Sequence, residues 1–175
     1  MRFCAAAALV ATIFFGMACG RSDFFRQYEY EEEVYLSLDG TATVYVNASI
    51  PALDALRGAS FDPAPTARFD RDAVRAFFTT PVTRVTRVSN SRRNGRRFAH
   101  IRMDVDDVRR LGEAAPFAWS SYRFAGEGDD FAYHQAVGPA AAKDVGKVNW
   151  SGQEIVAFRL HLPSNVIEHN AGEEN

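Results

Sequence analysis

The sequence has few of the residues and spacings on which most enzyme and metal sites depend. It contains two cysteines and four histidines in 175 residues, and no pair of histidines has a metal-ligand spacing such as His-x-x-x-His. Neither a Gly-x-Ser-x-Gly elbow nor a phosphate-binding loop occurs. Because catalysis has to be inferred from a site and not from a fold, we expect neither an enzyme nor a cofactor.

Three aspartates lie close together in the middle of the chain, at Asp104, Asp106 and Asp107. A cation site is one interpretation, but the segment lacks the regular ligand order and the following glutamate of an EF-hand. Helix capping explains these aspartates more simply, and no metal site is predicted.

The first residues have the order of a secretory signal. Arg2 gives a positive start, residues 3–18 are mostly apolar, and small residues end the run. The alternative is an uncleaved anchor, because the run lies close to the lower length limit for a membrane-spanning helix. Its alanine-rich composition and small-residue ending favour a signal peptide over residues 1–18.

The end of this signal, Gly16-Met17-Ala18-Cys19, resembles the lipobox of bacterial lipoproteins, in which the cysteine is acylated and becomes the first mature residue. Gly16 departs from the leucine usual in that family and also fits ordinary cleavage, which would leave a free thiol. Cys4 would be removed with the signal, so Cys19 has no disulfide partner after export. We therefore expect a lipid on Cys19 that anchors an exported protein to a bacterial membrane, outer or cytoplasmic.

The rest of the chain is about one domain in length. A net charge of −2 and 47% hydrophobic residues suit a globular domain with a core. We expect a tether over residues 19–26, a single domain over 27–170 and a mobile tail over 171–175.

Alternating apolar and polar residues predict that this domain consists mostly of strands. Two strands flank the Asp39-Gly40 turn, and two more flank Asn94-Gly95. A third hairpin is predicted around residues 126–129. A last strand over 154–162 should point Phe158 into the core.

Three helical segments are predicted between these strands. They cover residues 51–57, residues up to Phe78 with Asp70 as N-cap, and residues 107–115 with Asp106 as N-cap. The expected fold class is α+β, with a mainly antiparallel sheet built from successive hairpins and two helices packed on one face.

Two segments resemble the exported domain of LppM-like lipoproteins. The first is Tyr28-Glu29-Tyr30 followed by the strand and turn up to Thr43. The second is residues 162–170, which match a Leu-Pro-x-x-Val-x-x-x-Asn pattern. The resemblance implies an envelope domain tethered by lipid or helix, with an apolar face suited to lipid-like ligands and no catalytic residues. Another strand usually follows in that family, so an end at Asn175 leaves open a shortened version or a fragment.

The chain has only two lysines, so the basic residues around the Asn94-Gly95 turn are arginines. Arg92, Arg93, Arg96 and Arg97 surround the Asn94-Gly95 turn, and arginine forks suit phosphate and carboxylate groups. We expect these four to bind an anionic lipid surface or an acidic envelope partner, and we expect no nucleic acid outside the cell. The alternative is a solvated edge that discourages strand pairing.

Aromatic residues are dense in the later half of the chain. Most are expected in the core, although some could line an apolar groove for a lipid-like ligand. The resulting expectation is a non-catalytic, membrane-tethered envelope lipoprotein that binds a lipid-like ligand or an envelope component. The alternatives are a protein–protein interaction module with an exposed apolar patch and, less favoured, an enzyme with converging ionisable groups.

Overall fold

The computed structural model of this protein describes residues 28–146, 148 and 150–170. The predicted signal peptide, Cys19 and the predicted tail over 171–175 lie outside the described residues. Within the described part of the chain, no helix is long and apolar enough to span a bilayer.

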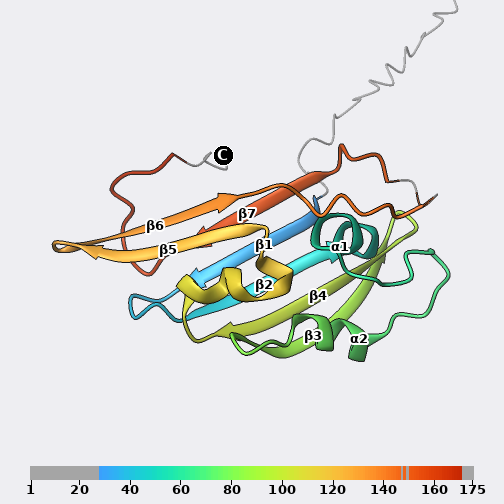
Figure 1. Ribbon diagram of the computed structural model, residues 1–175, viewed down its shortest axis with the longest axis horizontal. Coiled ribbons are helices and arrows are strands. Elements are labelled where there is room, and N and C mark those ends of the chain that lie inside the picture. The colour runs from blue at the N-terminus through green and yellow to red at the C-terminus, as the bar shows by residue number, and fades with distance from the viewer. Residues whose placement is uncertain (1–27, 147, 149, 171–175) are drawn as a thin grey trace, which may run out of the picture.

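Strands and short helices follow one another nearly in the predicted order (Figure 1). The strands are β1 (Tyr28–Leu36), β2 (Ala42–Ser49), β3 (Thr83–Arg93), β4 (Arg96–Val105), β5 (Ser120–Glu127), β6 (Asp130–Val137) and β7 (Ile155–His161). The helices are α1 (Ile50–Arg57) and α2 (Arg71–Phe78), with the 3-10 helices η1 (Val108–Glu113) and η2 (Ala115–Phe117).

Five strands form the main sheet in the order β3-β4-β2-β1-β7, and β5 pairs with β6 in a separate two-stranded sheet. Neighbours in the main sheet are antiparallel except β7, which lies parallel to β1. The predicted α+β class with a mainly antiparallel sheet and two helices is confirmed. Successive hairpins do not account for β7, because a long connection, and not a tight turn, joins β6 to it.

Both α-helices, both 3-10 helices and the β5–β6 sheet cover one face of the main sheet (Figure 1). Inward side chains of β1, β2 and β4 pack there in one cluster with side chains from α1, α2, η1 and η2. Its fully buried members include Tyr30, Val34, Val44, Val46, Ile101, Met103, Leu53, Val74, Phe78, Val108, Leu111 and Phe117.

The two predicted α-helices are fixed by local signals. Ser49 Oγ accepts a hydrogen bond of 3.2 Å from the Ala52 amide at the start of α1, and Gly58 ends that helix with φ 69°. Asp70 accepts from the Asp72 and Ala73 amides at the start of α2. The predicted cap at Asp70 is therefore correct.

The prediction of a helix over residues 107–115 with Asp106 as its N-cap is wrong. The segment forms the 3-10 helices η1 and η2, and its cap is Asp107, which accepts from the Arg109 amide, and not Asp106. Gly112 lies against β5, where a Cβ would meet the Ser120 carbonyl oxygen at 2.9 Å. This close approach and Pro116 explain why a regular α-helix does not form.

A buried polar network holds the β5–β6 sheet against the main sheet. Glu32 of β1 points inward and forms a 2.7 Å ion pair with Arg57 at the end of α1. The same carboxylate accepts hydrogen bonds from Tyr122 of β5 at 2.9 Å and from Gln135 of β6 at 3.0 Å. One buried charge on the first sheet therefore binds groups from both strands of the second.

Aromatic rings enclose the Arg57 guanidinium. It stacks 3.5 Å from the Trp119 ring centroid and 4.3 Å from that of Tyr30. Its Nε and Nη1 find no hydrogen-bond partner among the described residues, so ring faces partly replace the missing acceptors. Burial, the largest cause, raises the pKa of Tyr30 and of Tyr122, which keeps both phenols protonated as donors.

Candidate functional site

The second face of the main sheet, opposite the helices, is the candidate site. Strand alternation directs polar and aromatic side chains of all five strands to this side. We call it the open face. It comprises Glu31, Glu33 and Tyr35 of β1, Thr43, Tyr45 and Asn47 of β2, Arg84, Arg87, Ser89, Ser91 and Arg93 of β3, His100, Arg102 and Asp104 of β4, and Arg159 and His161 of β7.

Two arginines of the open face lie directly opposite each other. Arg87 of β3 and Arg102 of β4 are register partners, and both are exposed. Among the residues that the structure describes, no ion pair to either arginine occurs. Like charges directly opposite on a sheet are destabilising, so the pair concentrates positive charge at some cost to the fold.

A β-bulge creates this arrangement. Thr86 is the extra residue between the pairs Val85–Met103 and Arg87–Arg102. Its hydroxyl donates a 3.2 Å hydrogen bond to the Arg102 carbonyl oxygen. In regular alternation, Arg84 and Arg87 would face opposite sides of the sheet, because three residue steps separate them. The bulge shifts the alternation of β3 by one residue, so both arginines face outward.

A row of hydrogen-bonded side chains crosses the open face from one edge to the other. Arg159 of β7 forms an ion pair with Glu31 of β1, and Asn47 of β2 donates to Glu31 at 3.2 Å. His100 of β4 bonds the Asn47 oxygen through Nδ1 at 3.0 Å and Ser91 of β3 through Nε2 at 2.8 Å. Each of the five strands contributes one residue to this row.

A groove of about 510 Å³ lies where the strands end near Thr41 and Pro163. Its walls include the Tyr35 ring, which stacks on the His161 imidazole at a centroid distance of 4.0 Å. Arg84 and Asp104 form a 3.1 Å ion pair at the same groove. The groove is therefore mixed in character, because apolar residues such as Leu162 and Pro163 line it together with the charged pair and the aromatic wall.

The four arginines predicted to bind an anionic surface are not equally available. Arg97 is buried and donates to backbone carbonyls of residues 62, 64 and 68, so it holds that loop. Arg96 is half-buried between Glu29, at 2.9 Å, and Glu154. Arg92 and Arg93 are exposed, but they point to opposite faces of the sheet. The structure does not bring the four guanidinium groups together at one surface.

The tip of the β3–β4 hairpin is held beside the start of β1. Arg93 donates a 2.7 Å hydrogen bond to the Tyr28 carbonyl oxygen, and its guanidinium lies 4.1 Å from the Phe98 ring centroid. The Arg96–Glu29 ion pair joins the same two segments. The end of the sheet where the predicted tether enters is thus the end that carries Arg93.

Two of the late aromatic residues are buried in the core, and most of the others are half-buried and pack against it. Phe117 and Tyr122 are buried, and Trp119 packs edge-to-face on Tyr30 at 5.7 Å. Phe158 lies inward as predicted, 5.7 Å from Trp119, but it is only half-buried. These contacts fill the space under the β5–β6 sheet, where the sequence allowed for a groove.

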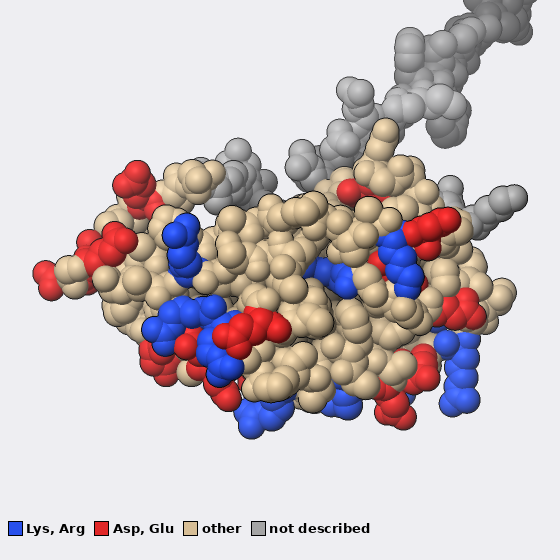
Figure 2. Space-filling view, viewed as in Figure 1, with Lys and Arg blue, Asp and Glu red and all other residues tan. Residues whose placement is uncertain are grey.

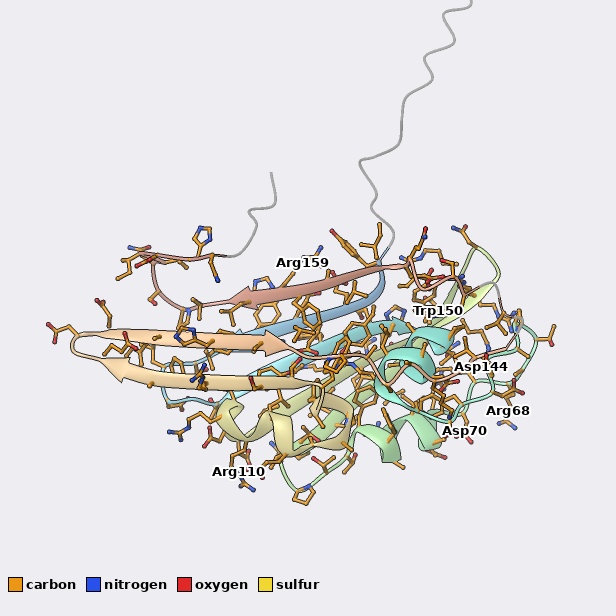
Figure 3. The ribbon with its side chains drawn as sticks, turned by 45° about the horizontal axis from the view of Figure 1, so that its top comes forward. Arg68, Asp70, Arg110, Asp144, Trp150 and Arg159 are labelled. Carbon is orange, nitrogen blue, oxygen red and sulfur yellow. The ribbon has the colours of Figure 1, made fainter. Side chains whose placement is uncertain are left out.

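We call the opposite side of the main sheet, under the helices and the β5–β6 sheet, the covered face. The surface of the molecule on this side carries its charges differently from the open face. Figure 2 shows broad uncharged areas between separated groups of charged side chains on this side. Arg109 and Arg110 of η1 belong to this side, and each is paired at 2.8 Å, with Asp107 and Glu113 respectively. In Figure 3, Arg110 on η1 and Arg159 on β7 lie at opposite edges of the molecule.

Sequence reasoning missed the residues that matter most in both layers. Glu32 interrupts the alternation of β1 with a charge at an inward position, and that interruption was the available signal. Arg87 and Arg102 gave no such signal, because their pairing depends on the register of two strands and on the bulge at Thr86. Within the described residues, no group of three potential metal ligands occurs.

No protein-family model and no curated protein matches this chain. Its function therefore has to be inferred from the residues themselves and from their geometry.

Proposed function

We propose that this protein is an exported lipoprotein, anchored through Cys19, that binds the phosphate groups of anionic membrane lipids with its open face. The observation that carries the proposal is the opposed pair Arg87 and Arg102, which lacks an acidic partner in the described structure. A phosphate group between the two guanidinium forks would remove their repulsion and accept bidentate hydrogen bonds.

The surroundings of this pair favour an anion over a cation or a neutral ligand. Arg84 and Arg93 lie on the same face of β3, so four arginines of two neighbouring strands point to one side. Asp104 is the nearby carboxylate in register with Arg84, and it neutralises that arginine alone. The remaining positive charge attracts an anionic bilayer by about 1 kcal/mol for each basic residue near its surface.

The position of the tether also favours a membrane ligand. Nine residue steps separate Cys19 from Tyr28, so a fully extended tether keeps the start of β1 within about 30 Å of the lipid anchor. Arg93 is hydrogen-bonded to Tyr28 and stays at that end of the sheet. A protein anchored in this way would hold basic side chains close to headgroups at a high effective concentration.

Vesicle capture tests the headgroup proposal. The full-length protein is placed in neutral phosphatidylcholine nanodiscs and exposed to vesicles with or without phosphatidylglycerol. We expect capture of the acidic vesicles, a loss of at least tenfold in Arg87→Gln/Arg102→Gln, and a similar loss on raising the salt concentration.

The matched control removes two arginines from the covered face. Arg109→Gln/Arg110→Gln has the same change in net charge but should capture acidic vesicles like the wild type. Equal loss in both variants would mean that net charge alone attracts the vesicles, and no loss in either would exclude the open face as the binding surface.

The anchor has its own test. Cys19→Ser should move the protein from the detergent-extracted membrane fraction to the soluble exported fraction. A protein that stays in the membrane with residues 1–18 still attached would contradict acylation and support an uncleaved anchor.

A further inference from the structure

The polar row across the open face fixes the direction of each of its hydrogen bonds. The Glu31 carboxylate, paired with Arg159, can only accept, so Asn47 must turn its NH₂ group toward Glu31. The Asn47 carbonyl oxygen then faces His100 Nδ1 at 3.0 Å. Because a carbonyl oxygen also only accepts, the hydrogen of the neutral imidazole is on Nδ1.

This tautomer leaves a lone pair on His100 Nε2. The Ser91 hydroxyl lies 2.8 Å from that nitrogen and therefore donates its proton to it. Burial, and secondly the positive charge of Arg93, lower the pKa of His100 below its ordinary value. The lowered pKa favours the neutral imidazole, whose Nε2 lone pair can accept a proton.

We propose that Ser91 is a nucleophile that takes an acyl group from a carboxylic ester, with His100 as its general base. The three relations that define such a site are all present: a hydroxyl bonded to a base, a base bonded to an orienting group, and an orienting group that is itself held. Asn47 is the positioning residue, and the Glu31–Arg159 ion pair holds it. The proposal does not depend on phosphate binding by Arg87 and Arg102.

The surroundings of Ser91 admit an ester and stabilise negative charge. Ser91 is exposed on β3, which is an edge strand of the main sheet. Phe98, its register partner on β4, is buried beside it. The Arg93 guanidinium lies over that ring on the same face of β3 as Ser91, where it would stabilise the negative charge that develops on the carbonyl oxygen of a bound ester.

The step is a simple acyl transfer. Ser91 Oγ attacks the ester carbonyl carbon while its proton moves to His100 Nε2. When the tetrahedral intermediate collapses, the bond to the leaving oxygen breaks and His100 returns the proton to it. The products are an acyl ester on Ser91 and a free alcohol, and nothing is oxidised or reduced.

Acetylation by p-nitrophenyl acetate tests this proposal on the full-length protein in detergent. We expect release of one equivalent of p-nitrophenol, one added acetyl group by intact mass, and its location on Ser91 by peptide mapping. Ser91→Ala should lose the modification. Ser89→Ala, on the same strand and face, should keep it.

Two further measurements separate reactivity from a structural role. His100→Gln should slow acetylation of Ser91 about a hundredfold, the order of a general-base contribution. Nitrogen NMR should find His100 in the Nδ1–H tautomer, and Asn47→Leu should abolish that preference and slow the reaction. Acetyl groups on amines alone, an unchanged rate in His100→Gln, or the Nε2–H tautomer in the wild type would each overturn the proposal.

Discussion

The covered face of the main sheet buries the ion pair of Glu32 with Arg57 and surrounds it with hydroxyls of Tyr30 and Tyr122. The open face spreads arginines and carboxylates of four strands, β1, β3, β4 and β7, over accessible surface, where an ion pair contributes about 0–1 kcal/mol. A buried charge can be satisfied in one arrangement only, so it fixes how the layers stack. An exposed charge is available to a ligand, so it can carry function at little cost to the fold.

The same substitution on the two faces gives the largest predicted contrast. Arg57→Leu leaves Glu32 buried without its counter-charge and should destabilise the protein by about 3–5 kcal/mol. Arg102→Leu removes an exposed arginine together with its repulsion from Arg87, so it should not destabilise the protein and should change the free energy of unfolding by no more than about 1 kcal/mol. Chemical denaturation of both variants measures the difference, and similar losses would mean that the faces are not energetically distinct.

A smaller loss of stability is expected at β7, the edge strand of the main sheet that carries Phe158. Phe158→Ala removes a half-buried ring that packs on Tyr30 and Trp119. Full burial would cost about 3–5 kcal/mol, so we expect about 2 kcal/mol here. The outward Tyr35→Ala is the control and should cost less than Phe158→Ala, as measured by thermal unfolding. A larger loss in Tyr35→Ala would show that β7 is held mainly from the open face.

The smallest predicted change in the free energy of unfolding is a stabilisation. Arg87→Gln relieves the repulsion with Arg102 and should stabilise the protein by about 0.2–1 kcal/mol while it weakens capture of acidic vesicles. Arg84→Gln breaks an ion pair with Asp104 and should give no such gain. A destabilised Arg87→Gln would mean that Arg87 supports the fold, and the case for a binding role would fail.

Local patterns were enough to predict most of the strands and the two α-helices, but not Glu32 or the 3-10 helices of the covered face. Alternation identified the strands, and Asp39-Gly40, Asn94-Gly95 and the Asp70 cap fixed turns and a helix start, because each of these signals acts over a few residues. The position of β7 was not predictable in this way. Its parallel pairing with β1 joins segments more than a hundred residues apart, and no turn between them sets the register.

The open face shows why the predicted arginine cluster differs from the structure. Simple alternation places Arg84 and Arg92 on one side of β3. The bulge at Thr86 shifts the register, so Arg87 and Arg93 share the face of Arg84 and Arg92 does not. Arg97 follows the inward pattern of the neighbouring strand and is buried. One inserted residue thus decides which guanidinium groups can meet the same ligand.

Arginine footprinting is the most direct test of the claim that the open face is the binding surface. The full-length protein, in neutral nanodiscs, is treated with a dicarbonyl reagent before and after addition of phosphatidylglycerol vesicles, and modification is measured peptide by peptide. We predict protection of Arg87 and Arg102, with Arg109 and Arg110 as reactive as before. Protection of Arg109 and Arg110, with Arg87 and Arg102 unchanged, would contradict it.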